Sequence, residues 1–394
     1  MTIRQQFGWK SPRFRLSLMA KVTLTNVSKT YRGTKGREIV AIKDVSLQIE
    51  DRALTVVTGP RGSGKSSMLR MIAGLEGIPQ GEIHIGDRRS NGLPAGKRDV
   101  AMVFANDSLY PQMMVYKNIA FGLHRRGFAQ PEIKKRVRDV ASILEIEQVL
   151  ALKPGALSPE QRQRVALARA VALQPKVFLF DEPLAQLDVT SRSGLRTQIT
   201  KLHERLQTTM IYATADSLEA ISIADQIVVL NNGVVQQTGT PRALYDQPVD
   251  LFVAGFIGEP PMNFVQGELR RERNALVFSE AGDGTIELQL GNVDSSALRE
   301  FIGRQISLGI RPDAIEVSDF APWNENTSSK FPVLVDRIEP LGGAAYAYLQ
   351  TGAHTLVCRS RHLLDRGQAA QRMHFKIDLE RVHLFDPAST KRIV

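Results

Sequence analysis

The sequence has few features that would place the chain in a membrane or outside the cell. It has one cysteine, Cys358, so no internal disulfide can form, which fits a reducing compartment. It has no run of about 18 apolar residues, so we expect no membrane-spanning helix. It has no low-complexity tract. No dense Lys/Arg run is interleaved with aromatic residues, so we expect no nucleic-acid partner.

The bulk composition is that of a folded protein with more than one domain. The chain has 394 residues, 43% of them hydrophobic and 23% charged, with a net charge of +10. Residues 1–18 carry four basic residues, no acidic residue and no apolar core of a signal peptide. We predict that they form a disordered basic extension or precede the true start at Met19; the alternative is an arm that contacts lipid headgroups.

The order of apolar segments predicts two domains. Residues 19–240 alternate apolar strands such as "LTVVTG", "KVFLFDEP" and "TTMIYAT" with helices, which indicates an α/β domain with a largely parallel sheet. Within it, residues 89–156 or so have helical spacing, and we predict a mainly helical subdomain. Residues 241–264 are rich in Pro and Gly and are predicted to be a linker. Short apolar runs then predict a small all-β barrel or sandwich over 265–394.

The strongest local motif is "GPRGSGKSS", which fits the phosphate-binding pattern G-x-x-x-x-G-K-[ST] between a strand and a helix. Its glycines allow backbone N–H groups to surround a phosphate, and the helix N-terminus adds a favourable dipole. We predict that Lys65 contacts the β- and γ-phosphates of a nucleotide and that Ser66 ligates Mg²⁺. The predicted nucleotide-binding residues of this loop are Gly59, Pro60, Arg61, Gly62, Ser63, Gly64, Lys65, Ser66 and Ser67.

A second apolar strand ends in two carboxylates, Asp181 and Glu182. On its own this pattern is weak, but downstream of a phosphate-binding loop it predicts that Asp181 holds Mg²⁺ and that Glu182 polarises an attacking water. A structural carboxylate is the alternative role for Glu182.

Further motifs resemble those of ABC-type ATPases. "LSPEQRQRVALARAV" followed by "VFLFDEPLAQLD" is similar to the signature segment and Mg-binding strand of that family. "SLYPQMMVYKNIAFGL", "FVAGFIGEPPMNF" and the C-terminal "LGIRPDAIEV" narrow the resemblance to the ATP-binding subunits of maltose-type and glycerol-3-phosphate-type importers. It covers nearly the whole chain and implies a P-loop NTPase domain followed by an OB-like regulatory barrel.

The resemblance also implies roles for single residues. Tyr31 matches the aromatic residue that stacks on adenine, with a core tyrosine as the alternative. The family forms head-to-tail dimers in which ATP lies between one chain's Lys65 loop and the other chain's signature loop. Ser158, Gln161 and Asp188 match residues that act across that interface; for Asp188 the alternative is an ordinary helix-start residue.

Three places depart from the family pattern. Ala105 stands where the family has a glutamine that touches Mg²⁺ and the attacking water. Pro159 and Glu160 replace two glycines of the signature loop, and Glu160 would bring a carboxylate toward the opposing γ-phosphate unless a cation intervenes or the side chain turns to solvent. Ala215, in "YATADSLEA", stands where the family has a histidine that contacts the γ-phosphate.

The resemblance therefore implies an ATP-binding importer subunit that uses ATP and Mg²⁺ and takes up a sugar, polyol or glycerol phosphate. Its implied partners are transmembrane permease subunits, a second ATPase subunit in a homo- or heterodimer, and indirectly an extracytoplasmic substrate-binding protein. Its implied location is the cytoplasmic face of the membrane. We expect impaired hydrolysis by this chain; the alternative is a non-hydrolysing regulatory subunit beside an intact ATPase.

Overall fold

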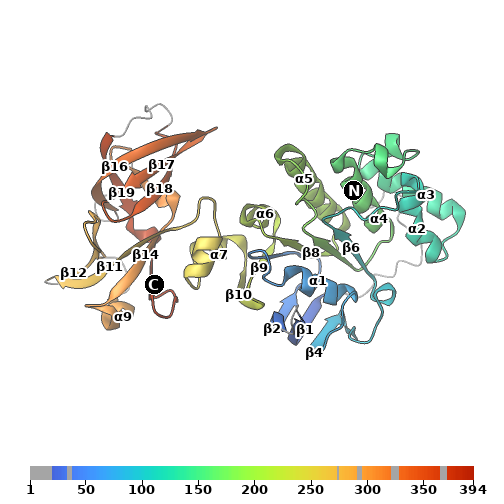
Figure 1. Ribbon diagram of the computed structural model, residues 1–394, viewed down its shortest axis with the longest axis horizontal. Helices are drawn as coiled ribbons and strands as arrows, with labels where there is room; N and C mark the ends of the chain where they lie inside the picture. Colours follow the sequence, from blue (N-terminus) through green and yellow to red (C-terminus); the bar gives the residue numbers. More distant parts are fainter. Residues whose placement is uncertain (1–19, 33–37, 273–274, 291–294, 321–327, 364–370) are drawn as a thin grey trace, which may run out of the picture. The chain divides into compact units, whose positions relative to one another are not determined.

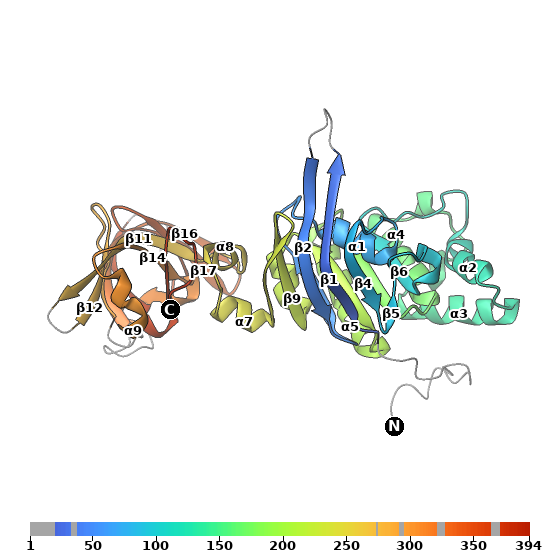
Figure 2. The ribbon, with the colours of Figure 1, turned by 90° about the horizontal axis from the view of Figure 1, so that it is seen from below.

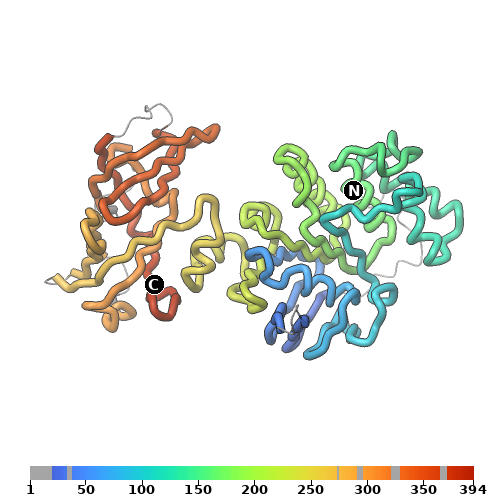
Figure 3. The backbone as a smooth tube through the Cα atoms, viewed as in Figure 1, coloured from blue at the N-terminus to red at the C-terminus, as the bar shows by residue number. Residues whose placement is uncertain are grey.

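The chain forms two compact units, Met1–Pro241 and Arg242–Val394. The computed structural model describes residues 20–32, 38–272, 275–290, 295–320, 328–363 and 371–394, so the predicted basic extension lies outside the described residues. The course of the chain through each unit can be followed in Figure 1 and, as a smooth tube, in Figure 3. No helix in the described ranges has the length and apolar character needed to span a membrane.

A six-stranded sheet in the order β10-β9-β3-β8-β7-β6 is the centre of the first unit. Its strands are β3 (Leu54–Thr58), β6 (Val100–Phe104), β7 (Val177–Asp181), β8 (Thr209–Thr214), β9 (Gln226–Asn231) and β10 (Val234–Gly239). All neighbours pair in parallel except β9 and β10. β3, β7 and β8 are buried along their whole length, as expected for central parallel strands covered on both faces. The predicted parallel α/β sheet is confirmed.

A second, antiparallel sheet completes the strands of this unit. It has the order β2-β1-β4-β5, with β1 (Val22–Arg32), β2 (Glu38–Ile49), β4 (Gln80–Ile85) and β5 (Arg88–Arg89). Figure 2 shows β2, β1 and β4 side by side. Apolar residues of both sheets and of α1 (Lys65–Ala73), among them Met68, Leu69 and Ile72, share one core. This core fixes the start of α1 against the central sheet.

The described part of the first unit also contains the α-helices α2 (Val115–Arg125), α3 (Gln130–Ile143), α4 (Pro159–Ala172), α5 (Val189–Leu206) and α6 (Ser217–Ile223). α2 and α3 pack against each other and against α4. The segment predicted to be mainly helical, 89–156, therefore needs a correction. Its α-helices begin only at Val115. Before them lie a 3₁₀ turn, Ala95–Lys97, and the run "VAMVF", which pairs with β7 as an edge strand of the central sheet.

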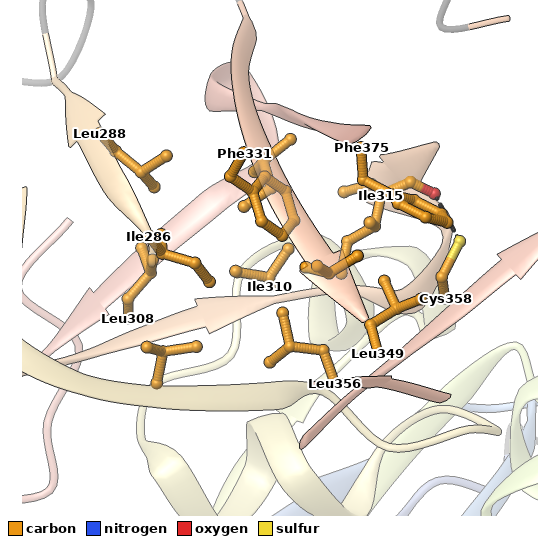
Figure 4. Packing of buried hydrophobic residues seen from close by; sticks show 14 of the residues in the cluster. Ile286, Leu288, Leu308, Ile310, Ile315, Phe331, Leu349, Leu356, Cys358 and Phe375 are labelled. Atoms are coloured by element: carbon orange, nitrogen blue, oxygen red, sulfur yellow. Dashed lines mark hydrogen bonds between the residues drawn. The ribbon is translucent and has the colours of Figure 1, made fainter. Parts of the chain in front are cut away.

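The second unit consists of two five-stranded antiparallel sheets, β13-β12-β11-β14-β20 and β15-β19-β16-β17-β18. The strands are β11 (Asn263–Glu272), β12 (Ala275–Glu280), β13 (Glu287–Gln289), β14 (Gln305–Ile310), β15 (Ile315–Val317), β16 (Ser328–Leu341), β17 (Ala344–Gln350), β18 (Thr355–Ser360), β19 (Gln371–Asp378) and β20 (Val382–Phe385). Side chains from both sheets, including Leu308, Phe331 and Phe375, meet in one apolar core (Figure 4). Cys358 is buried in this core and unpaired.

Three short helices accompany these sheets: α7 (Pro241–Asp246), α8 (Leu251–Phe256) and α9 (Ser295–Leu298). α7 and α8 occupy the segment predicted to be a linker, which is folded into the second unit instead. Arg311, 2% exposed, explains this: its guanidinium donates hydrogen bonds to the carbonyl oxygens of Tyr245, Ala254 and Ile257. The segment is thus tied to the barrel through buried backbone groups.

Candidate functional site

The carboxyl ends of four parallel strands meet at one edge of the central sheet. The register places Thr58 of β3 beside Thr214 of β8, and Asp181 of β7 beside both Phe104 of β6 and Ala213 of β8. The phosphate-binding loop, Ala105, Glu182 and Ala215 each follow directly after one of these strands. Residues far apart in the sequence are therefore gathered at one edge, the usual position of a ligand site in an open parallel sheet.

The loop between β3 and α1 can only be built with glycine at two positions. Gly59 has φ +150°, and a Cβ there would lie 1.9 Å from the carbonyl oxygen of Leu230. Gly64 has φ +108°, and its Cβ would lie 2.2 Å from the carbonyl oxygen of Ala41. The backbone can therefore wrap closely before it enters α1, whose first N–H groups have no intrahelical acceptor and attract an anion.

Lys65 lies inside this loop. Its side chain is 3% exposed, and its Nζ donates hydrogen bonds of 2.9 Å to the carbonyl oxygens of Gly59 and Pro60. The carboxylate of Glu182 is 3.9 Å away. Burial lowers the pKa of Lys65, and the nearby Glu182 partly counteracts that effect. The amine is thus held where an anionic ligand would gain a charge-assisted hydrogen bond.

Ser66 and Asp181 bring two oxygen donors together. The Ser66 hydroxyl donates a 2.6 Å hydrogen bond to Oδ1 of Asp181. Hydroxyl and carboxylate oxygens suit Mg²⁺, which usually takes few protein ligands and completes its shell with water and phosphate oxygens. Within the described ranges no group of three or more His, Cys, Asp or Glu is placed to hold a metal ion.

An unsatisfied hydroxyl supports the fit of a phosphate to the loop. Ser63 is 3% exposed, and its Oγ has no hydrogen-bond partner. A buried hydroxyl without a partner is destabilising, and a phosphate oxygen is a suitable acceptor for it. Of the remaining loop residues, Arg61 and Gly62 are exposed, and Gly62 has φ +80°.

Glu182 is held by the backbone of the neighbouring strand. Its N–H donates a 3.0 Å hydrogen bond to the carbonyl oxygen of Ala213, and its φ is +48°. A left-handed conformation is uncommon for a residue other than glycine and occurs preferentially at functional sites. Its side chain is 29% exposed, so the carboxylate remains accessible.

Tyr31 reaches the phosphate-binding helix by its hydroxyl. The hydroxyl lies 2.9 Å from Oγ of Ser67 and also bonds to the Glu76 carboxylate, while Nζ of Lys29 lies 5.0 Å from the ring centroid. Burial, followed by the Glu76 hydrogen bond, raises the pKa of Tyr31. The ring is half-buried beside the loop; stacking on adenine remains a prediction.

The residues predicted to act across a dimer lie at the starts of two other helices. Ser158 caps α4: its Oγ accepts from the Gln161 N–H at 3.1 Å, and Oε1 of Gln161 accepts from the Ser158 N–H at 3.0 Å. Pro159 occupies the first helical position, where its missing N–H is not needed. Asp188 caps α5, and the hydrogen bond from the Ser191 backbone lowers the pKa of Asp188.

Glu160 does not carry a free carboxylate. Its Oε1 accepts hydrogen bonds from Nε and Nη2 of Arg164, at 3.1 and 2.8 Å, and Oε2 lies 3.4 Å from the Ser191 hydroxyl. Arg164 also binds the Glu145 carboxylate at 3.0 Å. A cation that neutralises Glu160 is one of the two exceptions expected from the sequence, and Arg164 is such a cation. The repulsion expected at this loop is correspondingly smaller.

Ala105 and Ala215 directly follow strands β6 and β8 at the sheet edge. A small cavity of about 20 Å³ is lined by Ala105, Pro159, Gln163 and Pro183, among others. Ala215 lies half-buried between Thr214 and the capping residue of α6. Neither alanine has a side chain that could contact a phosphate or position a water.

Sequence reasoning missed a buried polar network beside Ala215. The hydroxyls of Thr214 and Tyr212 donate to Oε2 of Glu219, at 2.6 and 3.2 Å, and burial raises the pKa of Glu219. Asp216 caps α6, the helix that contains Glu219, and its side chain accepts a 3.0 Å hydrogen bond from the Glu219 N–H. The capping pattern "DSLE" was the available signal, because an acid three residues after a cap is typical of a helix start.

Comparisons with known proteins agree with this geometry. Residues 42–185 match the family described as ABC transporter, and residues 258–315 match the MalK OB fold domain. The Bacillus subtilis "uncharacterized ABC transporter ATP-binding protein YurJ" is 41% identical over 380 residues, covering 95% of this chain and 100% of the relative. The "sn-glycerol-3-phosphate import ATP-binding protein UgpC" of Cupriavidus metallidurans is 41% identical over 386 residues, covering 95% and 99%.

A solved structure has a fold similar to that of the first unit. It is described as "Dimeric structure of a post-hydrolysis state of the ATP-binding cassette MJ0796 bound to ADP and Pi". It superposes with a TM-score of 0.51 and 31% identity, and covers 56% of this chain and 98% of the other.

Proposed function

This chain belongs to the ABC transporter ATP-binding proteins, in the group with a C-terminal MalK-type OB domain, and from that premise we propose that it is the ATP-binding subunit of an importer. Its cargo is a sugar, polyol or glycerol phosphate. The observation that carries the proposal is the gathering of the phosphate-binding loop, the Ser66–Asp181 pair and Glu182 at one sheet edge. The relatives named as sn-glycerol-3-phosphate import ATP-binding proteins support the cargo class.

The proposed assembly contains two ATP-binding subunits on the cytoplasmic face of a membrane. Each nucleotide lies between one chain's Lys65 loop and the other chain's Ser158 loop, with Asp188 at the interface. Transmembrane permease subunits receive the motion, and an extracytoplasmic substrate-binding protein delivers the cargo to them. The similar cassette, which is described as dimeric, supports this arrangement.

The chain's own residues define what the site can do. Lys65 exchanges its two carbonyl acceptors for phosphate oxygens, and the loop amides bind the same phosphate. Ser66 and Asp181 would hold Mg²⁺, which when bound neutralises phosphate charge. Glu182, partly exposed beside the Lys65 amine, accepts the proton of an attacking water.

We further propose that hydrolysis by this chain is impaired. Ala105 and Ala215 both follow strands of the catalytic edge and offer no donor to the water or the γ-phosphate. Removing one preorganised donor typically lowers a rate by about 10²–10³. In a heterodimer each composite site receives one half from this chain. The site that combines the partner's Lys loop with this chain's "LSPEQ" uses the partner's glutamine and histidine, so it does most of the hydrolysis.

A second candidate is a non-hydrolysing regulatory subunit. The observation that favours it is that both alanines lie in a fully folded site that retains Lys65 and Asp181, so ATP binding is kept while turnover is lost. Such a subunit would act by nucleotide-dependent docking beside an intact ATPase.

Two measurements on the purified chain test these proposals. Titration calorimetry should show ATP binding that is lost in Lys65→Met. A phosphate-release assay should show turnover at least about 100-fold below that of an intact family member. Failure to bind ATP would refute the nucleotide site. Normal turnover that Glu182→Gln abolishes would refute impaired hydrolysis and leave the binding proposal intact.

A further inference from the structure

A cleft of about 180 Å³ lies between α3, α4 and α5, separate from the sheet edge that carries the nucleotide site. Its lining includes Ile143 at the end of α3 and Glu145 in the turn that follows, Arg164 of α4, and one face of α5 from Gly194 to Arg205. This volume is large enough for a small organic ligand and several times that of one water.

The charge of the cleft favours an anion. Arg164, Lys201 and Arg205 line it, against the single carboxylate of Glu145. That carboxylate is already bonded to Arg164 at 3.0 Å. Among the residues that the structure describes, Lys201 and Arg205 have no ion-pair partner. One turn apart on α5, they present two unneutralised cations on one face of the helix.

Two uncharged residues of α5 add evidence for a ligand. Oε1 of Gln198 is buried and has no hydrogen-bond partner, so a group that donates a hydrogen bond would satisfy it. Gly194 lies within α5, where glycine is less stable than alanine by about 0.5–1 kcal/mol. A Cβ at Gly194 would meet no atom within 4 Å, so packing does not require glycine there. Gly194 lines the cleft and adds no side chain to it.

We propose that this cleft binds a small phosphomonoester that carries hydroxyl groups, such as a polyol phosphate. Lys201 and Arg205 bind the phosphate, and a ligand hydroxyl donates to Oε1 of Gln198. Phosphate gains charge-assisted hydrogen bonds from both cations, whereas a neutral polyol gains none. The site is independent of the nucleotide loop and of whether the chain hydrolyses ATP.

The position of Arg164 gives the site a regulatory consequence, which rests on the proposed function. Arg164 lines the cleft and also holds Glu160 of the "LSPEQ" loop. A bound dianion competes with Glu160 for this guanidinium. The released carboxylate then disfavours approach of a second subunit's γ-phosphate. Ligand binding would therefore weaken ATP-driven dimerisation.

The test is equilibrium binding of sn-glycerol 3-phosphate to the full chain carrying Lys65→Met, which removes phosphate binding at the nucleotide loop. We expect the double change Lys201→Gln/Arg205→Gln to weaken binding about tenfold or more, because charge-assisted hydrogen bonds are lost. Gly194→Met, which fills the cleft without changing charge, should weaken it similarly. Lys21→Gln/Lys176→Gln is the matched control, since it removes two exposed cations outside the cleft. Its affinity for sn-glycerol 3-phosphate should stay within about twofold of that of the Lys65→Met chain.

Ligand analogues and vesicles complete the experiment. Glycerol should bind at least about tenfold more weakly than sn-glycerol 3-phosphate, because it lacks the phosphate. Equal affinity across all variants, or loss of all binding in Lys65→Met alone, would overturn the proposal. Binding seen only with vesicles that contain phosphatidic acid would instead assign the cleft to a lipid headgroup. Circular dichroism on each variant separates loss of binding from loss of fold.

Discussion

Restoring the two missing side chains is the most direct test of the degenerate nucleotide site. The variants are Ala105→Gln, Ala215→His and their combination. The structure favours correct placement of the new histidine, because the backbone on both sides of Ala215 is already held. Oγ1 of Thr214 accepts from the Asp216 N–H at 3.1 Å, and Asp216 caps α6. Ala215 itself is half-buried, so a larger side chain can extend toward the sheet edge without displacing the core.

The expected gain follows from the value of one preorganised donor. A single donor at such a site changes the rate by about 10²–10³, or about 2.7–4 kcal/mol of transition-state stabilisation. We therefore expect about a hundredfold gain for the double variant relative to the unmodified chain. The gains of the single variants should not add, because the two groups act on the same phosphate and water.

Steady-state phosphate release by the purified chain, with excess Mg²⁺ and ATP, measures this gain. Adding Glu182→Gln to the restored variant is the control and should remove the gained activity, which separates it from a contaminating ATPase. The reasoning is refuted if the restored variant folds and binds ATP but hydrolyses it no faster than the unmodified chain. The limiting defect would then lie in the "LSPEQ" loop.

Four further predictions concern the charges of the two units. In a Glu182→Gln background, Arg164→Gln should weaken ATP-induced dimerisation measured by light scattering, and the added change Glu160→Gln should restore it. Arg311→Met should lower the free energy of unfolding by about 3 kcal/mol or more in urea, since three buried carbonyls lose their donor. The partly exposed Arg381, which pairs with Asp313, should contribute about 1 kcal/mol or less to stability. Burial lowers the pKa of His383 to about 4, so the unfolded state binds more protons between about pH 6.5 and 4. Stability of the second unit should therefore fall by up to about 3 kcal/mol as pH drops through that window, and His383→Gln should flatten the dependence.

The sequence predicted the central fold because its signals were local and long enough. β3, β7 and β8 coincide with continuous apolar runs, and the glycine spacing of the phosphate loop is imposed by backbone contacts at Gly59 and Gly64. The strand "VAMVF" was absorbed into a predicted helical segment because five residues carry little periodicity. Its assignment as a strand depends on pairing with β7, more than seventy residues later in the chain.

The electrostatics of the signature loop were only half predictable. Glu160 and Arg164 are four residues apart on one helix, so their pairing follows from where the helix begins. Glu145, which binds the same guanidinium, lies in the turn after α3, and only the packing of α3 against α4 brings it there. The polar contacts that span elements are therefore the ones that required the structure.

We expect the departures from the family pattern to affect the chemistry of the site and to leave the fold nearly unchanged. Pro159 and Glu160 fit the first turn of α4, where proline loses no hydrogen bond and a carboxylate is favoured by the helix dipole. Ala105 and Ala215 keep the backbone of the sheet edge while removing only functional groups. Lys65 is buried against its own loop, and this position lowers its pKa. A chain that did not bind nucleotide would have no need for this arrangement. The retained loop and the lost donors together favour a subunit that closes on ATP and relies on a partner for most of the hydrolysis.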